Sequence, residues 1–396
     1  MKLLDKYLIF SSVFALFSEN FAFHYIIDWK LFYIILFVNL GVFLFKTKLV
    51  ANKNMIIVYS FLLIHGIIMY VVLRNPIGSL FAQLIGVVLS SFYYYNFIRE
   101  YNTKRLFKTY VNTAFYIAVL AIPMFYLNIN LFTPQRLNGI LSEPAHYAAI
   151  MLPAVYVTLM KKSYFKFTII LITILLSKSS IGYIGLVLIL FLPLLKIKYF
   201  LKYSFLVFVI LGASSYYIYT QWDVYSDENN GNIFVRRLKQ TQESLVATNT
   251  GEFKKHINLS SYALLSNVFV SKNIFFNYPL GTGLGSYKYE YEKVYPELSP
   301  PDYLIKQNLS KINQQDANSL FLRMLADLGI FGLLMISYFF YRSYNLFKKE
   351  SKVYEQGIFF YLIIKLFREG HYFPPEFYFF VLIFIKDFND KNITHS

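Results

Sequence analysis

Residues 136–147, RLNGILSEPAHY, place an arginine, a glutamate and a histidine between two apolar runs of the sequence. Charged side chains and irregular backbone are costly at the depth of a membrane and usually serve a function there. Ser142 or Glu143 is expected to cap a helix that begins at Pro144, and the positive end of that helix dipole suits an anion. Glu143 and His146, three residues apart, are expected to share a helix face and are candidate catalytic groups.

A structural interpretation of the same stretch competes with this functional one. Glu143 would then only cap the helix, and Arg136 would form an ion pair with it that holds the loop. Under the functional interpretation Arg136 binds an anionic group, while Glu143 either accepts a proton or orients that arginine. The spacing of the two residues is compatible with both interpretations.

Two later stretches supply further candidate acids and bases. Asp316 stands just before a predicted late span, at the expected membrane mouth, which makes it a better candidate base than Asp327. Arg323 and Asp327 are four residues apart and can pair inside a helical bundle, either in a site or as a structural ion pair. Arg368 and His371 follow another predicted span, although a polar turn between two helices would also accommodate them.

The remaining candidates for anion binding lie in other connections. Arg236 and Arg237 open a predicted amphipathic helix at residues 233–246, where the guanidinium fork suits a diphosphate and a solvated helix face is the alternative. Lys178 is a weaker candidate of the same kind. The glycine-rich stretch 278–291, YPLGTGLGSYKYEY, follows no βαβ pattern, so it indicates either a tight turn or a close approach to a sugar or diphosphate.

The sequence has no signature of a metal site or of a serine nucleophile. It contains no HExxH motif, no GxSxG motif and no cysteine. We therefore expect no metal and no other cofactor. The formal net charge of +16 would suggest a nucleic-acid partner in a soluble protein. Basic residues in the cytoplasmic loops of a membrane protein explain the charge better, so we expect no nucleic-acid partner.

The composition indicates that helices in a membrane position these charges. Hydrophobic residues make up 57% of the 396 residues and charged residues 15%, whereas soluble domains are about 45–50% apolar and 25% charged. A span needs about 20 apolar residues, and on this basis we predict an all-α integral membrane protein with about twelve transmembrane helices. These predicted spans cover residues 7–24, 31–45, 55–73, 78–98, 108–127, 145–160, 164–177, 180–195, 203–220, 319–341, 354–370 and 373–387.

The distribution of basic residues predicts how the chain crosses the membrane. Every second connection is basic, and the connections between carry mostly single cations. By the positive-inside rule both termini are cytoplasmic, so residues 136–146, Lys178 and residues 368–371 face outward. The cytoplasmic loops are too short to hold a nucleotide-binding domain. The basic clusters fall at the N-terminus and at residues 46–54, 99–108, 161–166, 196–202, 342–352 and 386–391.

One long loop divides the chain into three parts. Residues 1–220 contain predicted helices 1–9, residues 221–318 form a large extracytoplasmic (periplasmic) loop, and residues 319–396 contain helices 10–12. Long loops without a function are uncommon, and short helices are expected within this one at residues 233–246 and 262–270. Its tyrosines, such as those at residues 287–291, could stack on sugar rings.

These motifs, in this order, resemble those of the bacterial O-antigen polymerase (Wzy-type) and O-antigen ligase superfamily. The resemblance rests on RLNGILSEP at residues 136–144, SKSSIGYIGL at 177–186, PLGTGLGSY at 279–287 and NSLFL followed by GIFG at 318–332. It implies a polytopic membrane glycosyltransferase that uses a polyprenyl-diphosphate-linked glycan without a metal. Ligase-type relatives usually carry histidine just before the asparagine of the last motif, whereas this chain has Asp316 and Ala317 there.

The resemblance therefore implies a polymerase that joins undecaprenyl-diphosphate-linked repeat units of O-antigen or capsule type on the outer face of the bacterial cytoplasmic (inner) membrane. The alternatives are an O-antigen ligase that moves a finished glycan to a lipid or protein, and a lipid-linked glycan flippase or transporter. Transporters commonly have two similar halves, which the division into nine and three spans disfavours. A chain-length regulator and a flippase are implied partners.

Such a reaction needs groups that accept a proton and groups that neutralise the leaving diphosphate. The candidate catalytic residues are Glu143, Asp316, His146 and His371. The candidate diphosphate-binding or glycan-binding residues are Arg136, Arg236, Arg237, Arg323, Arg368 and Lys178.

Overall fold

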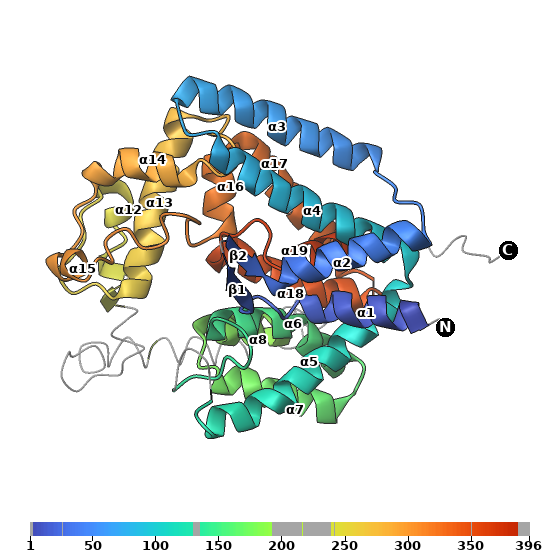
Figure 1. The fold of residues 1–396 in the computed structure, drawn as a ribbon. Coiled ribbons are helices and arrows are strands. Elements are labelled where there is room, and N and C mark those ends of the chain that lie inside the picture. Colours follow the sequence, from blue (N-terminus) through green and yellow to red (C-terminus); the bar gives the residue numbers. More distant parts are fainter. Residues whose placement is uncertain are drawn as a thin grey trace.

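The computed structural model describes residues 3–25, 27–129, 135–191, 216, 239–240, 242–349 and 351–386. Regular structure in these residues is helical apart from one short hairpin, formed by β1 (Ala22–Tyr25) and β2 (Ile27–Lys30) (Figure 1). The predicted helical class is therefore confirmed, with the hairpin as an addition that the sequence did not indicate.

Among the described residues, three helices are long and apolar enough to cross a membrane: α3 (Lys53–Leu73), α4 (Gly78–Glu100) and α5 (Thr103–Tyr126). Shorter apolar helices accompany them: α2 (Leu31–Lys46), α6 (Pro144–Met160), α7 (Tyr164–Leu176) and α8 (Ser180–Phe191). These helices indicate a membrane protein. The predicted span at residues 203–220 lies outside the described residues except for Tyr216, so the count of twelve stays a prediction.

The start of α1 (Leu3–Ala15) and the end of α19 (Phe377–Ile385) lie at the same end of the helical bundle. There, Lys46 pairs with Asp5 at 2.7 Å and with Glu100 at 2.9 Å. Lys386 donates a hydrogen bond of 3.0 Å to the carbonyl oxygen of Ile98, near the end of α4. The described beginning and end of the chain therefore share one side of the bundle.

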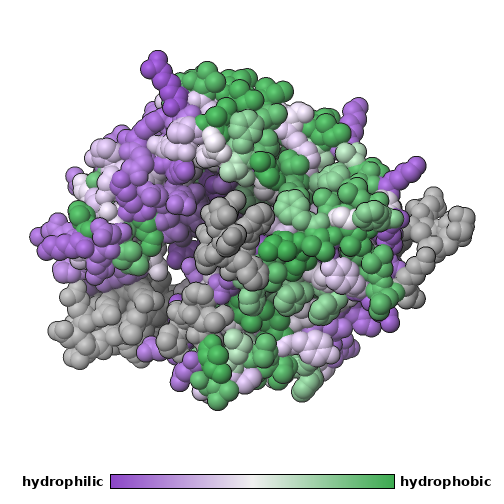
Figure 2. All heavy atoms as spheres, viewed as in Figure 1, coloured by the Kyte–Doolittle hydropathy of each residue, from purple (hydrophilic) through white to green (hydrophobic). Residues whose placement is uncertain are grey.

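The described part of the long loop, residues 239–240 and 242–318, covers the opposite end of the bundle (Figure 1), and we call it the loop domain. Its Glu290 accepts a hydrogen bond of 2.8 Å from Asn75, in the turn between α3 and α4. Figure 2 shows hydrophilic residues gathered over the loop domain and hydrophobic residues over the helices beside it. Its helices are α12 (Ala247–Thr250), α13 (Leu259–Asn277), α14 (Tyr287–Val294), the 3₁₀ helix η2 (Tyr295–Glu297) and α15 (Asp302–Lys306).

Two helices were predicted in the long loop, and the described residues cover only one of them completely. The helix expected at residues 262–270 is confirmed and lies inside the longer α13, which begins where Asn258 caps the Ser261 amide. Of the helix expected at residues 233–246, residues 233–238 and 241 lie outside the described residues.

The predicted first span at residues 7–24 is wrong in its second half. Helix α1 ends at Ala15, and the chain then makes tight turns in which the Phe17 and Ser18 amides bond to carbonyls three residues earlier. Glu19 follows these turns and takes part in an ion pair with a distant helix, described below. A carboxylate that must reach such a partner is incompatible with a continuous apolar span.

The predicted late span at residues 319–341 is broken into α16 (Leu320–Leu328) and α17 (Ile330–Leu346). Gly329 between them has φ 57°, a conformation that favours glycine. The Ile330 amide donates a hydrogen bond of 2.9 Å to the Pro279 carbonyl oxygen, and a Cβ on Gly329 would overlap that oxygen. The break therefore depends on contact with the glycine-rich turn of the loop domain.

This contact leads to a stability prediction. Gly329→Ala is expected to lower the unfolding temperature of the purified protein, because the strained backbone conformation alone costs about 1–3 kcal/mol. The matched control is Gly41→Ala in α2, where an added Cβ would meet no atom within 4 Å. Thermal unfolding in detergent measures both, and equal unfolding temperatures for the two variants would contradict the assigned role of Gly329.

Candidate functional site

The N-terminus of α6 forms at the predicted place. Glu143 is the N-cap residue with extended backbone, and Pro144 occupies the first turn, but the Glu143 side chain makes no capping hydrogen bond. The Arg136 Nε and Nη2 atoms donate to the carbonyl oxygens of Ser177 and Lys178 at 3.2 and 3.1 Å. Arg136 and Glu143, both in the described part of the chain, form no ion pair with each other. The structural interpretation that paired them is therefore wrong, and Arg136 ties its loop to the turn between α7 and α8.

His146, in the first turn of α6, contacts a residue that the sequence did not single out. Its Nδ1 atom lies 2.7 Å from Oε1 of Glu19, and the Ser142 hydroxyl donates to Oε2 of Glu19 at 3.0 Å. Glu19 lies outside any helix, between α1 and β1. Burial alone would raise the pKa of Glu19, but the hydrogen bond and charge of His146, with smaller effects from Lys365 and Ser142, outweigh it and lower that pKa to about 2. Glu19 is therefore an ionised partner of His146.

A second group of buried charges lies at the C-terminal end of α18 (Val353–Arg368). Lys365 is 1% exposed and pairs with Glu369, one turn later, and with Glu376 at 3.1 Å. Tyr361 donates a hydrogen bond of 2.7 Å to the same Glu376 oxygen. A lysine inside an apolar run with a glutamate four residues later was the local signal for this pair.

The two groups form one assembly, which we call the buried charge network and define as Glu19, His146, Lys365, Glu369 and Glu376. Glu369 interacts electrostatically with His146, and Lys365 does so with Glu19. Helices α6 and α18, which carry His146 and Lys365, pack against each other. The network therefore joins the segment after α1, the start of α6, the end of α18 and the approach to α19.

Four predicted site residues are linked by electrostatic interactions. The His371 Nε2 atom lies 3.4 Å from Oδ2 of Asp316, and the charges of Glu143 and Asp316 both act on the Arg368 guanidinium. The His371 side chain is 55% exposed and that of Asp316 15%, so solvent reaches the pair. We call Glu143, Asp316, Arg368 and His371 the mouth cluster. It combines a cation suited to an anionic group with a carboxylate and an imidazole that can accept a proton.

Gly370 allows the backbone after α18 to lie close to the backbone of Asp316. It stands between the network residue Glu369 and His371, and a Cβ at this position would overlap the carbonyl oxygen of Asp316. The backbone after α18 therefore lies directly against the segment that precedes α16. Only glycine permits this contact, which explains its place between the charged residues.

Arg323 supports the turn that contains Gly370. Its Nη1 atom donates to the Gly370 carbonyl oxygen at 2.9 Å, and its guanidinium carbon lies 4.5 Å from the centre of the Tyr372 ring. The predicted pairing with Asp327, one helical turn later, is confirmed at 3.6 Å. Arg323 is 3% exposed, so in this structure it supports the mouth cluster from within the protein and does not face solvent.

Asp327 anchors the glycine-rich stretch of the loop domain to α16. Its carboxylate accepts hydrogen bonds from the backbone amides of Gly285 at 2.9 Å and Tyr287 at 3.0 Å. The stretch is thus a tight turn docked on a helix, as the structural interpretation predicted. Tyr287 and Tyr291 are fully buried beside α13 and α16, so the expectation that these two tyrosines stack on sugar rings is wrong.

The remaining predicted anion-binding residues are Lys178, Arg236 and Arg237. Lys178 is exposed in the turn between α7 and α8, where its backbone oxygen accepts the hydrogen bond from Arg136. Arg236 and Arg237 lie outside the described residues.

The fold and this site define a polytopic membrane protein with solvent-accessible charges at one end of its helical bundle. Residues 165–337 match the family model described as O-antigen ligase. The match confirms the resemblance to the O-antigen ligase and polymerase superfamily, whose members are glycosyltransferase-like membrane enzymes. The matched segment contains Asp316, whereas Glu143, Arg368 and His371 lie outside it. No curated protein and no solved structure matches the chain.

Proposed function

We propose that the chain is a polysaccharide polymerase that joins undecaprenyl-diphosphate-linked oligosaccharide repeat units on the outer face of the bacterial cytoplasmic membrane. The observation that carries the proposal is the mouth cluster, in which Asp316 lies 3.4 Å from the exposed His371 and Arg368 interacts electrostatically with Glu143 and Asp316. A cation next to a proton acceptor is what glycan transfer from a diphosphate requires.

The proposed topology has twelve spans, both termini in the cytoplasm and the long loop outside the cell or in the periplasm. Two arrangements in the described structure support it. The start of α1 and the end of α19 lie together at the end of the bundle where Lys46 and Lys386 gather. The loop domain, which contains Asp316 of the mouth cluster, lies at the opposite end (Figure 1). In the proposed topology the site is away from cytoplasmic nucleotides, which a lipid-linked donor permits.

In the proposed reaction an acceptor hydroxyl attacks the anomeric carbon of the donor glycan. A bond forms between the acceptor oxygen and that carbon, and the bond from the carbon to the diphosphate oxygen breaks. The diphosphate leaves with the electron pair, and the Arg368 guanidinium stabilises its charge. The hydroxyl proton passes to the Asp316–His371 pair, whose exposed imidazole releases it to solvent. Glu143 orients Arg368 from the start of α6.

An O-antigen ligase is the second candidate, and specific observations bear on the choice. The description of the matched family favours a ligase. Asp316 stands where ligase-type relatives usually carry histidine, which favours a polymerase. In this chain the histidine beside that position comes from His371, after α18. The donor and the site are the same in both candidates, and the acceptor differs.

The proposed partners follow from the proposed reaction. They are the lipid bilayer, undecaprenyl-diphosphate-linked oligosaccharides, a flippase that delivers them and a chain-length regulator. A lipid-linked donor has to reach the mouth cluster from the outer leaflet, so a flippase must act before this enzyme.

Glycan analysis of a deletion strain tests the proposal. Loss of a polymerase is expected to leave single repeat units on the surface lipid, and the wild-type gene is expected to restore long chains. Polymer retained on undecaprenyl diphosphate would instead identify a ligase. Absence of any exported glycan would favour a flippase, and an unchanged glycan profile would contradict all three functions.

A further inference from the structure

The His146 imidazole uses only one of its two ring nitrogens within the described structure. Its Nδ1 atom lies 2.7 Å from Oε1 of Glu19 and 3.2 Å from the hydroxyl oxygen of Ser142. No hydrogen-bond or ion-pair partner lies at Nε2 among the residues that the structure describes, and the side chain is 19% exposed, so solvent reaches this nitrogen. Nε2 is therefore accessible to a ligand.

The contacts of Nδ1 determine its protonation. The Glu19 carboxylate is ionised and can only accept hydrogen bonds. The Ser142 hydroxyl donates its hydrogen to the other carboxylate oxygen of Glu19 at 3.0 Å, so it has none to give to the ring. Nδ1 must therefore carry the hydrogen of its own bond to Glu19, and only the state of Nε2 is left open.

The charges around the ring favour a second proton, on Nε2. Partial burial disfavours a charged ring, but carboxylates face it from two directions: Glu19 from the segment after α1, and Glu369 from the residue that follows α18. Lys365 is the cation that opposes them, and its own charge is engaged by Glu369 and, at 3.1 Å, by Glu376. His146 is therefore an imidazolium that can donate from Nε2.

Two further interactions place His146 next to the mouth cluster. Glu143 precedes it by three residues at the start of α6, and the charge of Glu143 acts on the Arg368 guanidinium. Glu369 follows Arg368 in the chain, and its charge acts on His146. The packing of α6 against α18 brings these two segments together. His146 and Arg368 therefore border the same part of the site.

A polyprenyl diphosphate needs more than the one cation that the mouth cluster supplies. Its leaving group carries negative charge on both phosphates, and Arg368 is the single arginine of the cluster. Arg323, which is 3% exposed, is engaged by the Gly370 carbonyl oxygen and by Asp327. The diphosphate thus requires a second charged donor that lies near Arg368 and is reached by solvent, and His146 meets these conditions.

We propose that Nε2–H of His146 donates a hydrogen bond to a phosphate oxygen of the polyprenyl diphosphate, and that Glu19 is the positioning residue that orients the ring. This role rests on the proposed function, since the diphosphate is the leaving group of that reaction. Negative charge grows on the diphosphate as its bond to the anomeric carbon breaks, so the hydrogen bond strengthens in the transition state. The proton stays on the ring, and release of the diphosphate returns His146 to its starting state.

Binding of undecaprenyl diphosphate to the full-length protein in a neutral detergent tests the role of Nε2. The ligand is expected to raise the unfolding temperature in a saturable manner. His146→Asn is expected to raise the half-saturating concentration about tenfold, because the asparagine amide can still donate to Glu19 but does not extend to the position of Nε2. His146→Gln places an uncharged amide near that position, so an intermediate shift is expected.

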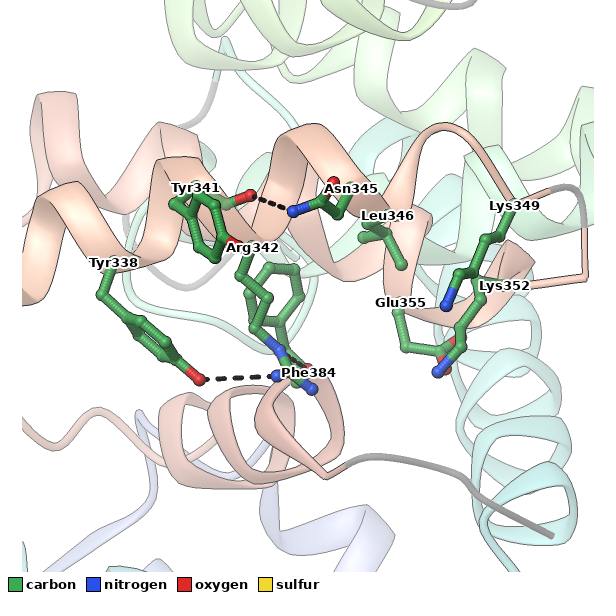
Figure 3. Close-up of a pocket in the computed structure, with 9 residues that line it drawn as sticks. All are labelled: Tyr338, Tyr341, Arg342, Asn345, Leu346, Lys349, Lys352, Glu355 and Phe384. Atoms are coloured by element: carbon green, nitrogen blue, oxygen red, sulfur yellow. Dashed lines mark hydrogen bonds and ion pairs between the residues drawn. The ribbon is translucent and has the colours of Figure 1, made fainter.

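Two variants control for the loss of a histidine and for the loss of a cation. His256→Asn changes an exposed histidine of the loop domain. Lys349→Gln changes a lysine in the cavity of about 160 Å³ that lies between α17, α18 and α19 (Figure 3). Neither residue belongs to the mouth cluster or to the buried charge network, so both variants are expected to keep the wild-type half-saturating concentration.

NMR of ¹⁵N-labelled histidine side chains tests the role of Glu19. The His146 ring is expected to give imidazolium signals at about pH 7.5, above the ordinary histidine pKa of about 6.5. Glu19→Gln is expected to increase the share of neutral ring at the same pH and to weaken the binding of undecaprenyl diphosphate. A merely structural role of Glu19 would leave the protonation of the ring unchanged.

The outcomes separate this role of His146 from the proposed function. Equal half-saturating concentrations for His146→Asn and the two controls would overturn it, and so would a neutral His146 ring in the wild-type protein. If Arg368→Gln weakens binding and His146→Asn does not, the proposed function stands and the role of His146 is wrong. If the wild-type protein does not bind undecaprenyl diphosphate in a saturable manner, the proposed donor itself is wrong.

Discussion

Arg368→Gln is expected to reduce the transfer of repeat units by about 10²–10³-fold, the loss that follows removal of one preorganised group that stabilises transition-state charge. In a deletion strain that carries this variant, single repeat units should replace long chains on the surface lipid. The reason is that the leaving diphosphate would lose the guanidinium that interacts electrostatically with Glu143 and Asp316. The measurement is the chain-length profile of the glycan, normalised to the amount of protein in the membrane.

Two variants control for charge and position. Arg74→Gln removes an exposed arginine from the turn between α3 and α4, at the same end of the bundle, and is expected to leave chain length unchanged. Arg368→Lys keeps the charge without the bidentate fork, so intermediate chain lengths are expected. Normal chain lengths with Arg368→Gln at the wild-type protein level would remove Arg368 from the proposed mechanism.

Lys365→Met is expected to cause the largest loss of stability, about 3–5 kcal/mol, because it leaves Glu369 and Glu376 buried without their cation. Such a loss is comparable to the whole stability of many proteins, so little folded protein should accumulate. The yield of monodisperse protein in detergent and its unfolding temperature measure the effect.

A compensated variant separates charge from shape in this prediction. Combining Lys365→Met with Glu369→Gln and Glu376→Gln removes these three buried charges at nearly constant side-chain volume. The combined variant is expected to recover much of the stability. Lys46→Met is the matched control at the other end of the bundle, where the lysine is 20% exposed and its ion pairs are expected to contribute less than about 1 kcal/mol. A Lys365→Met variant as stable as Lys46→Met would show that the network is not a stabilising element.

Local patterns in the sequence were sufficient to predict several helices of the fold. The apolar runs at residues 55–73, 78–98 and 108–127 match α3, α4 and α5 to within a few residues. Pro144 correctly marked the start of α6, because proline at a first helical turn is a short-range signal. The Arg323–Asp327 pair was predictable for the same reason, since one helical turn separates the two residues.

Features that depend on contacts between distant segments could not be predicted in this way. Glu19 and His146 are 127 residues apart, and nothing near Glu19 indicates its partner. The break at Gly329 requires the Pro279 carbonyl of the loop domain, so an apolar run read alone predicts a continuous helix. Asp316 and His371 were both recognised as candidates, but only the fold brings them within 3.4 Å of each other.

The anchoring of the glycine-rich turn has a mechanical consequence. Asp327 joins α16 to the loop domain, while Gly329 interrupts the helix between α16 and α17. Helix α16 is thus held by the loop domain at the point where it separates from α17. Any tension on the loop domain would pass from Asp327 to Arg323, and from there to Gly370 beside His371. Tension on the loop domain and the geometry of the mouth cluster are connected by this route.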